Sequence, residues 1–278
     1  MKVRYSFSSR RTRNIKNMRK QRAKYPKVLK NVVEISDIIL EVLDARFIKD
    51  TRNRDIEDAI IKKRKSIIYI INKSDLIDRK KIEIALPNPH VFISCKNRTG
   101  TKNLRNRIKA VAKKIEKPAE EKARKVTIGV IGYPNTGKSS IINILIGKKS
   151  APTASQAGFT KGMQKLKLTP EIMLLDSPGV IPQSEYSTSE RWAIIKQTKV
   201  GGRSYNQVKD PEFVVASLMK EFKGIFEKYY KINAEDNAEI LIEELGRKKG
   251  FLKRGGTVDE DKTTRYILKD WQEGRIKV

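Results

Sequence analysis

Residues 132–139 read Gly-Tyr-Pro-Asn-Thr-Gly-Lys-Ser, which matches the phosphate-binding pattern GxxxxGK[ST]. The apolar run VTIGVI at 126–131 precedes this segment, and residues 140–147 after it have the composition of a helix. Such a loop needs a strand before it and a helix after it, because its backbone N–H groups and the helix N-terminus must converge on the phosphates. The chain is therefore expected to contain a P-loop domain of the α/β class.

Short isoleucine-rich runs predict the rest of a sheet. They occupy residues 35–43, 66–71 and 91–93, each bounded by polar residues. Continuous apolar runs of this length are typical of strands buried on both faces of a mostly parallel sheet. Apolar residues recur at helical spacing over 104–115, as expected for a helix that covers such a sheet. Residues 162–175 resemble two strands joined at Thr169 and Pro170, a hairpin at one edge.

Helical signals replace strand signals after the polar stretch at 182–190. Asp210 and Pro211 form an N-cap and a first-turn proline, and an apolar face continues from there to Phe226. A second helix is expected to end at Gly246, and a third contains Trp271. The expected organisation is a basic arm over 1–30, a nucleotide-binding α/β domain over 31–185 and a small all-α domain over 190–278.

The charge of the chain indicates a polyanionic partner. Its 278 residues carry 61 Lys and Arg against 32 Asp and Glu, a net charge of +29, and residues 1–30 hold twelve of the cations and no acid. Such a field favours nucleic acid first and an anionic membrane second. The alternative for each basic segment is a solvated tail or a helix end at which the helix dipole favours cations. Candidate RNA contacts are Arg10, Arg11 and Arg13 in the arm, and Lys248, Lys249, Lys253 and Arg254 in the helical domain.

Other compositional features exclude several classes of protein. No stretch approaches the length of a membrane span, and the first thirty residues lack the apolar core of a signal peptide. Cys95 and His90 are the only residues of their types, so an intrachain disulfide and a Cys/His zinc site are both excluded. We expect a cytoplasmic protein, monomeric and not bound to membranes.

Asn72-Lys73-Ser74-Asp75 follows the run at 66–71, at a strand end where open α/β sheets bind ligands. A carboxylate at Asp75 can accept two hydrogen bonds from the N1–H and N2–H₂ groups of guanine, and adenine offers no such pair of donors. Residues of a second turn, after the run at 91–93, are placed to meet guanine O6 with their backbone N–H groups: Ser94, Cys95 and Lys96. The patterns favour GTP, with an ATPase as the alternative that nucleotide competition would test.

The phosphate side of the site is expected to hold Mg²⁺. Asp176-Ser177-Pro178-Gly179 follows a further apolar run, so that Asp176 can bind the metal through a water and the Gly179 N–H can meet the γ-phosphate. Thr160 is the candidate second hydroxyl ligand, with Thr153 as a rival. The expected catalytic residues are Lys138, Thr160 and Gly179. The P-loop residues expected around the phosphates are Asn135, Thr136, Gly137, Lys138, Ser139 and Ser140, of which Ser139 would also bind Mg²⁺.

These segments run in the order NKSD, SCK, GYPNTGKS, GFT, DSPG, with NKSD about sixty residues before the P-loop. Together they resemble the Ras-like (TRAFAC) GTPases, whose phosphate loop normally comes first. The order here resembles the circularly permuted GTPases of the RbgA/YlqF-like ribosome-assembly group. Asp44-Ala45-Arg46 is similar to that group's D-A-R motif, and residues 255–264 are similar to part of its C-terminal domain.

The resemblance implies a slow GTPase that binds the large ribosomal subunit or its precursor and is stimulated by it. Because Gly179 lies only a few residues before the linker at 182–190, we also expect the nucleotide state to control binding to rRNA or the subunit. The resemblance also places Asn135 where related GTPases bind K⁺. The chain departs from the family in Ser8-Ser9-Arg10, which follow Phe7 where bacterial relatives carry Pro-Gly-His. Val180 occupies the place of the water-orienting glutamine of Ras-type enzymes. These absences leave open a nucleic-acid-binding scaffold whose nucleotide site binds but does not turn over.

Overall fold

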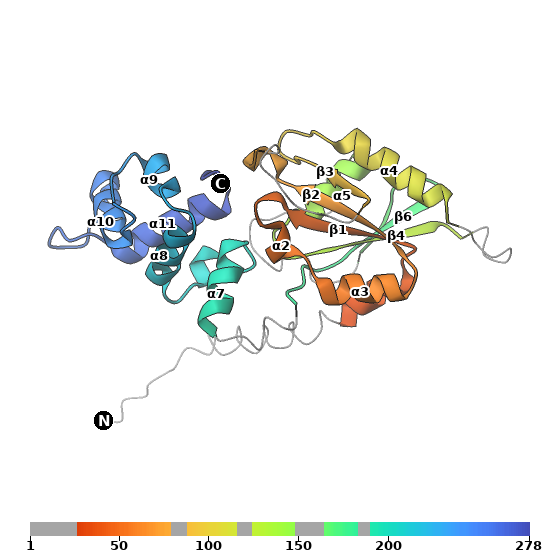
Figure 1. Ribbon diagram of the computed structural model, residues 1–278, viewed down its shortest axis with the longest axis horizontal. Helices are drawn as coiled ribbons and strands as arrows, with labels where there is room; N and C mark the ends of the chain where they lie inside the picture. The colour runs from red at the N-terminus through yellow and green to blue at the C-terminus, as the bar shows by residue number, and fades with distance from the viewer. Residues whose placement is uncertain (1–26, 79–87, 116–123, 148–163, 183–189) are drawn as a thin grey trace, which may run out of the picture.

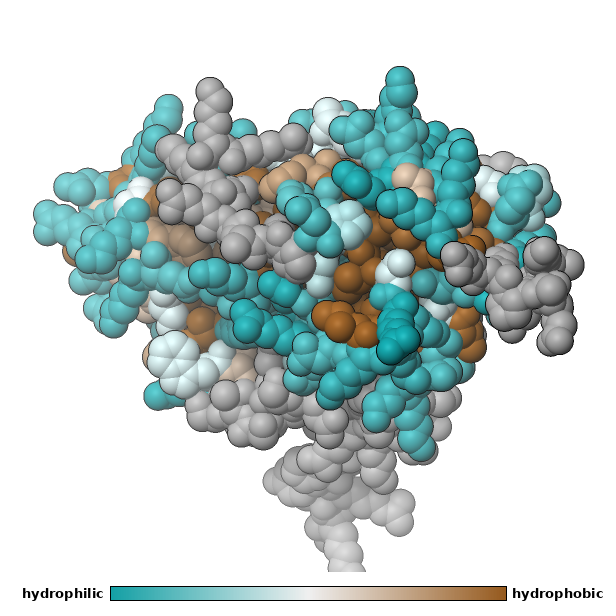
Figure 2. Space-filling model, turned by 45° about the vertical axis from the view of Figure 1, so that its right-hand side comes forward, coloured by the Kyte–Doolittle hydropathy of each residue, from teal (hydrophilic) through white to brown (hydrophobic). Residues whose placement is uncertain are grey.

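The structure, a computed structural model, describes residues 27–78, 88–115, 124–147, 164–182 and 190–278. Figure 1 shows an α/β domain beside a smaller group of helices formed by the C-terminal part of the chain. This confirms the expected fold class. Within the described ranges, no helix is long and apolar enough to span a bilayer. Hydrophilic side chains predominate on the face drawn in Figure 2.

A six-stranded sheet forms the centre of the α/β domain, in the order β3-β2-β1-β4-β6-β5. All neighbouring strands pair in parallel except β5, which pairs antiparallel with β6 at the edge, as predicted for the 162–175 hairpin. The strands are β1 (Ile38–Asp44), β2 (Ser66–Asn72), β3 (His90–Phe92), β4 (Val126–Gly132), β5 (Gln164–Lys167) and β6 (Ile172–Asp176).

The first strand starts later than its apolar run suggests. Residues 27–35 are helical, so Ile35 ends a helix and β1 begins at Ile38. The turn between them is fixed by the Ser36 hydroxyl, which donates to the Val32 carbonyl at 2.6 Å. A polar Ser-Asp pair inside an apolar run was therefore the boundary between two elements.

Helices cover both faces of the sheet. One face packs against α4 (Thr101–Lys113) and α5 (Lys138–Ile146), through residues such as Leu104 and Ile141. The other face packs against the helix at 27–35 and α3 (Arg54–Lys62). Three short helices follow strand ends: η1 (Ala45–Phe47), α2 (Ile48–Thr51) and η2 (Ser74–Leu76).

The second domain consists of helices around Trp271, whose side chain has no exposed surface. Phe226 stacks on the Trp271 ring at 5.4 Å between ring centroids. The helices are α7 (Glu190–Lys199), η5 (Tyr205–Gln207), α8 (Pro211–Glu221), α9 (Ile225–Tyr230), α10 (Ala238–Lys249) and α11 (Glu260–Gln272).

Two helix ends in this domain differ from the sequence prediction. The Asp210 side chain does cap α8, accepting from the Phe213 N–H at 3.2 Å, but the helix ends at Glu221 and Gly224 starts a new one. Gly246 does not end α10, which continues to Lys249 with Gly250 as its C-cap. A Cβ at Gly246 would lie 2.2 Å from Val258 Cγ1, so this glycine permits close packing rather than termination.

The two domains share a core. Phe47, from the segment after β1, packs among the buried residues of the helical domain, 5.8 Å from the Trp271 ring. Close by, the Lys199 ammonium of α7 pairs with Asp50 at 2.7 Å and with Glu221 at 3.0 Å. These contacts fix the helical domain beside the carboxyl ends of the strands.

Candidate nucleotide-binding site

The last residues of four parallel strands meet at one edge of the sheet. Asp44 pairs in register with Asn72 on β2, and Val42, two residues earlier, pairs with Gly132 on β4. Asp176 ends β6 on the far side of β4. Because open α/β sheets bind ligands at the carboxyl ends of their strands, this edge is the candidate site.

The P-loop connects β4 to α5 through two glycines with positive φ. Gly132 (φ +146) lies so close to β1 that a Cβ would be 2.4 Å from the Val42 carbonyl oxygen, and Gly137 (φ +100) precedes the first residue of α5. Within the loop, the buried Thr136 hydroxyl donates to the Tyr133 carbonyl at 2.9 Å. Ser139 and Ser140 lie in the first turn of α5, both half-buried.

Lys138 and Asp176 form the charged centre of the phosphate side. The Lys138 ammonium donates to the carbonyls of Gly132 at 3.1 Å and Tyr133 at 2.8 Å, and burial lowers its pKa to about 8 although Asp176 opposes the change. Burial likewise raises the pKa of Asp176 to about 6, against the charge of Lys138. Both Asp176 carboxylate oxygens are buried without a hydrogen-bond partner among the described residues.

The Asp176–Gly179 segment lies directly on the P-loop. The Ser177 hydroxyl donates to the Val130 carbonyl at 2.6 Å, and the Val180 N–H donates to the Gly132 carbonyl at 3.3 Å. A Cβ at Gly179 would lie 2.7 Å from Pro134 Cα and 2.9 Å from Lys138 Nζ. Only glycine permits this approach to the lysine that is expected to hold the γ-phosphate.

Asn72 joins the guanine-reading segment to the P-loop. Its amide donates to the Thr136 carbonyl at 2.8 Å and accepts from the Cys95 N–H at 3.3 Å. The Ser94 hydroxyl donates to the Asp75 carboxylate at 2.5 Å, which orients that carboxylate. Burial raises the pKa of the Cys95 thiol to about 12, so this cysteine is a packing residue rather than a nucleophile.

Asp44 gives the Asp-Ala-Arg segment a structural role that its sequence did not indicate. Its fully buried carboxylate accepts from Arg46 Nη2 at 2.9 Å and from Lys73 Nζ at 2.6 Å. Burial opposes ionisation, but the charges of Lys73 and Arg46 hold the pKa of Asp44 well below its usual range. Arg46 Nη1 also donates to the Trp271 carbonyl at 3.1 Å, so one carboxylate links the guanine-reading lysine to the helical domain.

A cavity of about 310 Å³ brings most of the predicted nucleotide-binding residues together. Its α/β-domain wall consists of Asn72, Lys73, Asp75, Leu76, Cys95, Lys96, Asn135, Gly137 and Ser140. The opposite wall consists of Gly201, Tyr205, Gln272 and Glu273 from the helical domain, none of which carries a motif that could have identified it. The predicted site is therefore closed on one side by the second domain.

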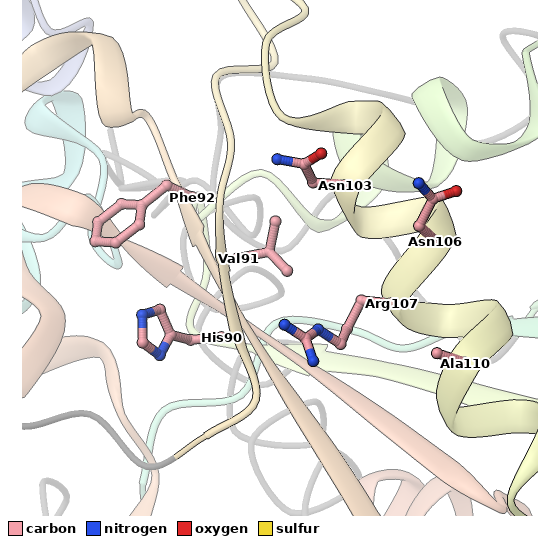
Figure 3. A pocket seen from close by; sticks show the side chains of 7 residues that line it. All are labelled: His90, Val91, Phe92, Asn103, Asn106, Arg107 and Ala110. Atoms are coloured by element: carbon pink, nitrogen blue, oxygen red, sulfur yellow. The ribbon is translucent and has the colours of Figure 1, made fainter.

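A larger cavity of about 500 Å³ lies elsewhere, between the edge strand β3 and α4. Figure 3 shows Val91, Asn103 and Arg107 beside it, with His90 and Phe92 on the other side of the strand. None of the predicted nucleotide-binding residues lines it, so size alone does not identify the functional site.

Several predicted residues are engaged elsewhere or lie outside the described ranges. Asn135 (φ +59) donates its amide to the Gly201 carbonyl at 2.7 Å. Of the RNA candidates, Lys248 donates to the Tyr230 carbonyl at 2.9 Å and Lys249 lies over the Tyr266 ring, while Lys253 and Arg254 are exposed in the turn after α10. The candidates outside the described residues are Arg10, Arg11, Arg13, Thr153 and Thr160 with its neighbours Gly158 and Phe159.

A phosphate loop, an NKxD segment and a DxxG segment at the carboxyl edge of one parallel sheet define a GTP-binding P-loop protein whose motifs run in permuted order. A family model described as "50S ribosome-binding GTPase" matches residues 127–242. The chain is also 36% identical, over 94% of its length and 68% of the relative's, to an uncharacterized GTP-binding protein of Methanocaldococcus jannaschii. This chain belongs to the RbgA/YlqF-like group of circularly permuted GTPases.

Two fungal relatives are longer proteins. GTPase grn1 of Schizosaccharomyces pombe is 30% identical over 92% of this chain and 61% of its own length. Nucleolar GTP-binding protein 2 of Saccharomyces cerevisiae is 32% identical over 89% of this chain and 51% of its own length. The chain thus spans about half to three fifths of the length of these relatives. Among solved structures, GNP-bound YlqF from T. maritima shares the fold, with a TM-score of 0.64 and 23% identity over 91% of this chain and 95% of that one.

Proposed function

We propose that this protein binds and hydrolyses GTP and acts in assembly of the large ribosomal subunit, binding rRNA or the subunit in a manner controlled by the nucleotide. The observation that carries the proposal is the convergence of Asn72–Asp75, the P-loop and Asp176–Gly179 at one edge of the sheet. The matching family description, which names the 50S ribosome, supports the ribosomal role. A cytoplasmic location remains a prediction, since the Saccharomyces cerevisiae relative is named for the nucleolus.

The residues on the phosphate side fit Mg²⁺. The Asp176 carboxylate is buried without a hydrogen-bond partner among the described residues, and oxygen ligands of this kind are what Mg²⁺ requires. Ser139 and Asp176 would hold the ion, with Thr160 as the third candidate, and Mg²⁺ would neutralise charge on the β- and γ-phosphates. For K⁺, Asn135 remains the candidate, and activity assays in KCl against NaCl would test it.

Lys138 and Gly179 would act on the γ-phosphate directly. A lysine that is buried, with its pKa lowered to about 8, interacts strongly with a phosphate because little water competes for its charge. The Gly179 backbone, close to the Lys138 ammonium, would place an N–H on the γ-phosphate and thereby distinguish GTP from GDP. Loss of that contact after hydrolysis would release the segment that leads into the helical domain.

Hydrolysis without a partner is expected to be slow. Val180 is buried against Val33, Ile60 and other apolar residues, and neither its side chain nor that of Ile181 can hydrogen-bond a water. The group that orients the attacking water must come from elsewhere, and we propose that the ribosomal subunit supplies or positions it.

Cosedimentation with large ribosomal subunits tests partner and switch together. We expect binding with a non-hydrolysable GTP analogue to exceed binding with GDP, and subunits to raise the rate of phosphate release. Equal binding in both nucleotide states would overturn nucleotide control. GTP binding with no phosphate release at any salt concentration would instead favour the scaffold whose site does not turn over, which the buried Val180 supports.

A further inference from the structure

The guanine side of the cavity lacks an aromatic residue from its own domain. Among the described residues that line it, the α/β domain contributes polar groups, glycine, Leu76 and Cys95, whereas the helical domain contributes Tyr205. A purine base presents two flat faces, and aromatic side chains stack on such faces with a favourable free energy of about 1–3 kcal/mol. Tyr205 is therefore the described lining residue best suited to cover a base face.

The backbone of Tyr205 is held firmly at the cavity. Its N–H donates to Gln272 Oε1 at 3.2 Å, and its carbonyl accepts from Arg265 Nη1 at 2.8 Å. Gln272 in turn donates to the carbonyls of Thr198 and Arg203 at 2.9 and 2.8 Å. Tyr205 thus belongs to a fixed wall rather than to a loop that fits around any ligand.

Close contacts hold this wall against the motifs of the α/β domain. The Asn135 amide donates to the Gly201 carbonyl, and a Cβ at Gly202 would lie 2.4 Å from the Tyr133 ring. On the guanine side, a Cβ at Gly274 would lie 2.6 Å from Leu76 Cδ1. Glycines at these positions of the helical domain allow it to pack on the P-loop and on the NKSD segment together.

We propose that the helical domain is a component of the guanine nucleotide site, with Tyr205 as a base-contacting residue opposite Lys73 and Asp75. The inference rests on the proposed GTP binding and adds a second domain to the site. Because Tyr205 would contact the base, which GDP and GTP share, both nucleotides use this contact alike. By linkage, either nucleotide therefore favours the docked helical domain over the undocked one.

Equilibrium binding of a fluorescent GDP and a fluorescent non-hydrolysable GTP analogue to the full chain tests the proposal. Tyr205→Ala is expected to weaken both nucleotides by the same factor, roughly 5- to 100-fold from the loss of stacking. Tyr205→Phe, which keeps the ring, should remain within about threefold of the unaltered protein. Tyr229→Ala is the matched control, since Tyr229 is a partly exposed tyrosine of the same domain that does not line the cavity.

The outcomes separate this inference from the proposed function. Unchanged affinity in Tyr205→Ala, a loss confined to the GTP analogue, or an equal loss in Tyr229→Ala would each overturn the role of Tyr205 and leave GTP binding intact. If the unaltered protein bound neither nucleotide, the proposed function would fail as well. Thermal unfolding without nucleotide shows whether Tyr205→Ala remains folded. If that variant unfolds early, Tyr205→Leu, which keeps an apolar side chain but removes the aromatic ring, must weaken the binding of both nucleotides instead.

Discussion

Asp44 is a carboxylate with no exposed surface, held between the cations of Arg46 and Lys73. The sequence marked the Asp-Ala-Arg segment only by its likeness to a family motif, because a contact between residues 44 and 73 depends on the pairing of β1 with β2. The position of Asp75 was predictable, since it needs only a strand before it. The contact with Asp44, which orients the neighbouring Lys73, could not be predicted in this way.

Replacing Asp44 with asparagine should therefore impair both folding and nucleotide binding. The buried Arg46 and the partly exposed Lys73 would lose their partner, and breaking a buried pair typically costs about 3–5 kcal/mol. We expect Asp44→Asn to lower the free energy of unfolding in urea by that order and to weaken GDP binding. Asp261→Asn, at an exposed pair with Arg265, should cost under about 1 kcal/mol. Similar losses in the two variants would contradict the role of Asp44.

Glu41 is a second buried carboxyl, in the middle of a strand that the sequence presents as apolar. Its Oε1 accepts from the Asn53 N–H at 3.0 Å, while Oε2 is buried without a partner among the described residues. Burial raises its pKa from 4.5 to about 8, and the charge of nearby Glu57 adds to the shift. Glu57 is itself bound by Arg52 and by the Tyr69 hydroxyl.

This raised pKa predicts a loss of stability as pH rises. Between about pH 4.5 and pH 8 the folded protein keeps a proton on Glu41 that the unfolded chain releases, so the free energy of unfolding falls across that range. Glu41→Gln keeps the acceptor for Asn53 and removes the titration. We expect it to be more stable than the unaltered protein by roughly 1–3 kcal/mol at pH 8.5 and by little at pH 5. Urea unfolding at both pH values checks this, and a difference independent of pH would refute it.

At the scale of elements, the sequence predicted those features that depend only on residues close together in the chain. The P-loop, the buried strands and the Asp210 cap follow from the spacing of residues along the chain, and the structure has them where the sequence placed them, except that β1 begins at Ile38 rather than Ile35. Two predictions were wrong: the helix that starts at Pro211 does not continue to Phe226, and α10 does not end at Gly246, which packs closely against Val258. From sequence alone, a glycine in a helical pattern predicts the end of the helix, because the surface that packs against it is not known.

Gly246→Ala tests whether packing against Val258 overrides helix propensity. Alanine is preferred over glycine inside a helix by about 1 kcal/mol. A Cβ 2.2 Å from Val258 Cγ1, however, cannot be accommodated without displacing the 258 segment, and overpacking of this kind costs about 1–3 kcal/mol. We expect a net loss of stability in urea unfolding. Combining Gly246→Ala with Val258→Ala should cost less than the sum of the two single changes, whereas simple additivity would mean that the contact does not matter.

At the scale of the whole molecule, the site lies between two domains that the sequence presents as separate. The base-reading and phosphate-binding motifs could be recognised in the sequence because the residues that contact the nucleotide lie within each motif. Tyr205, Gln272 and Glu273 belong to helix ends whose position depends on Phe47 and Arg46 reaching into the helical domain. No spacing along the chain encodes that approach, so the lining residues of the helical domain could be found only in the folded molecule.

The net charge of +29 leads to a prediction that belongs to the molecule as a whole. RNA binding by many cations weakens steeply with salt, with a slope of about −0.7 to −0.9 per phosphate contact in a plot of log K against log salt. Lys253 and Arg254 are exposed in a turn after α10, whereas Lys248 and Lys249 already contact Tyr230 and Tyr266. If that turn binds RNA phosphates, removing Lys253 and Arg254 should make the slope of log K against log salt less negative.

Removing both cations, as Lys253→Ala with Arg254→Ala, should weaken binding to a large-subunit rRNA fragment and make the slope less negative by about 1–2. Filter binding over a series of KCl concentrations, with a GTP analogue present, measures both quantities. Arg107→Ala with Lys109→Ala removes the same charge from the exposed face of α4. Because the two double variants have equal net charge, a general electrostatic effect changes them equally. A change confined to the first variant places the RNA on the turn of the helical domain, and equal changes in both would mean that the turn makes no specific contact.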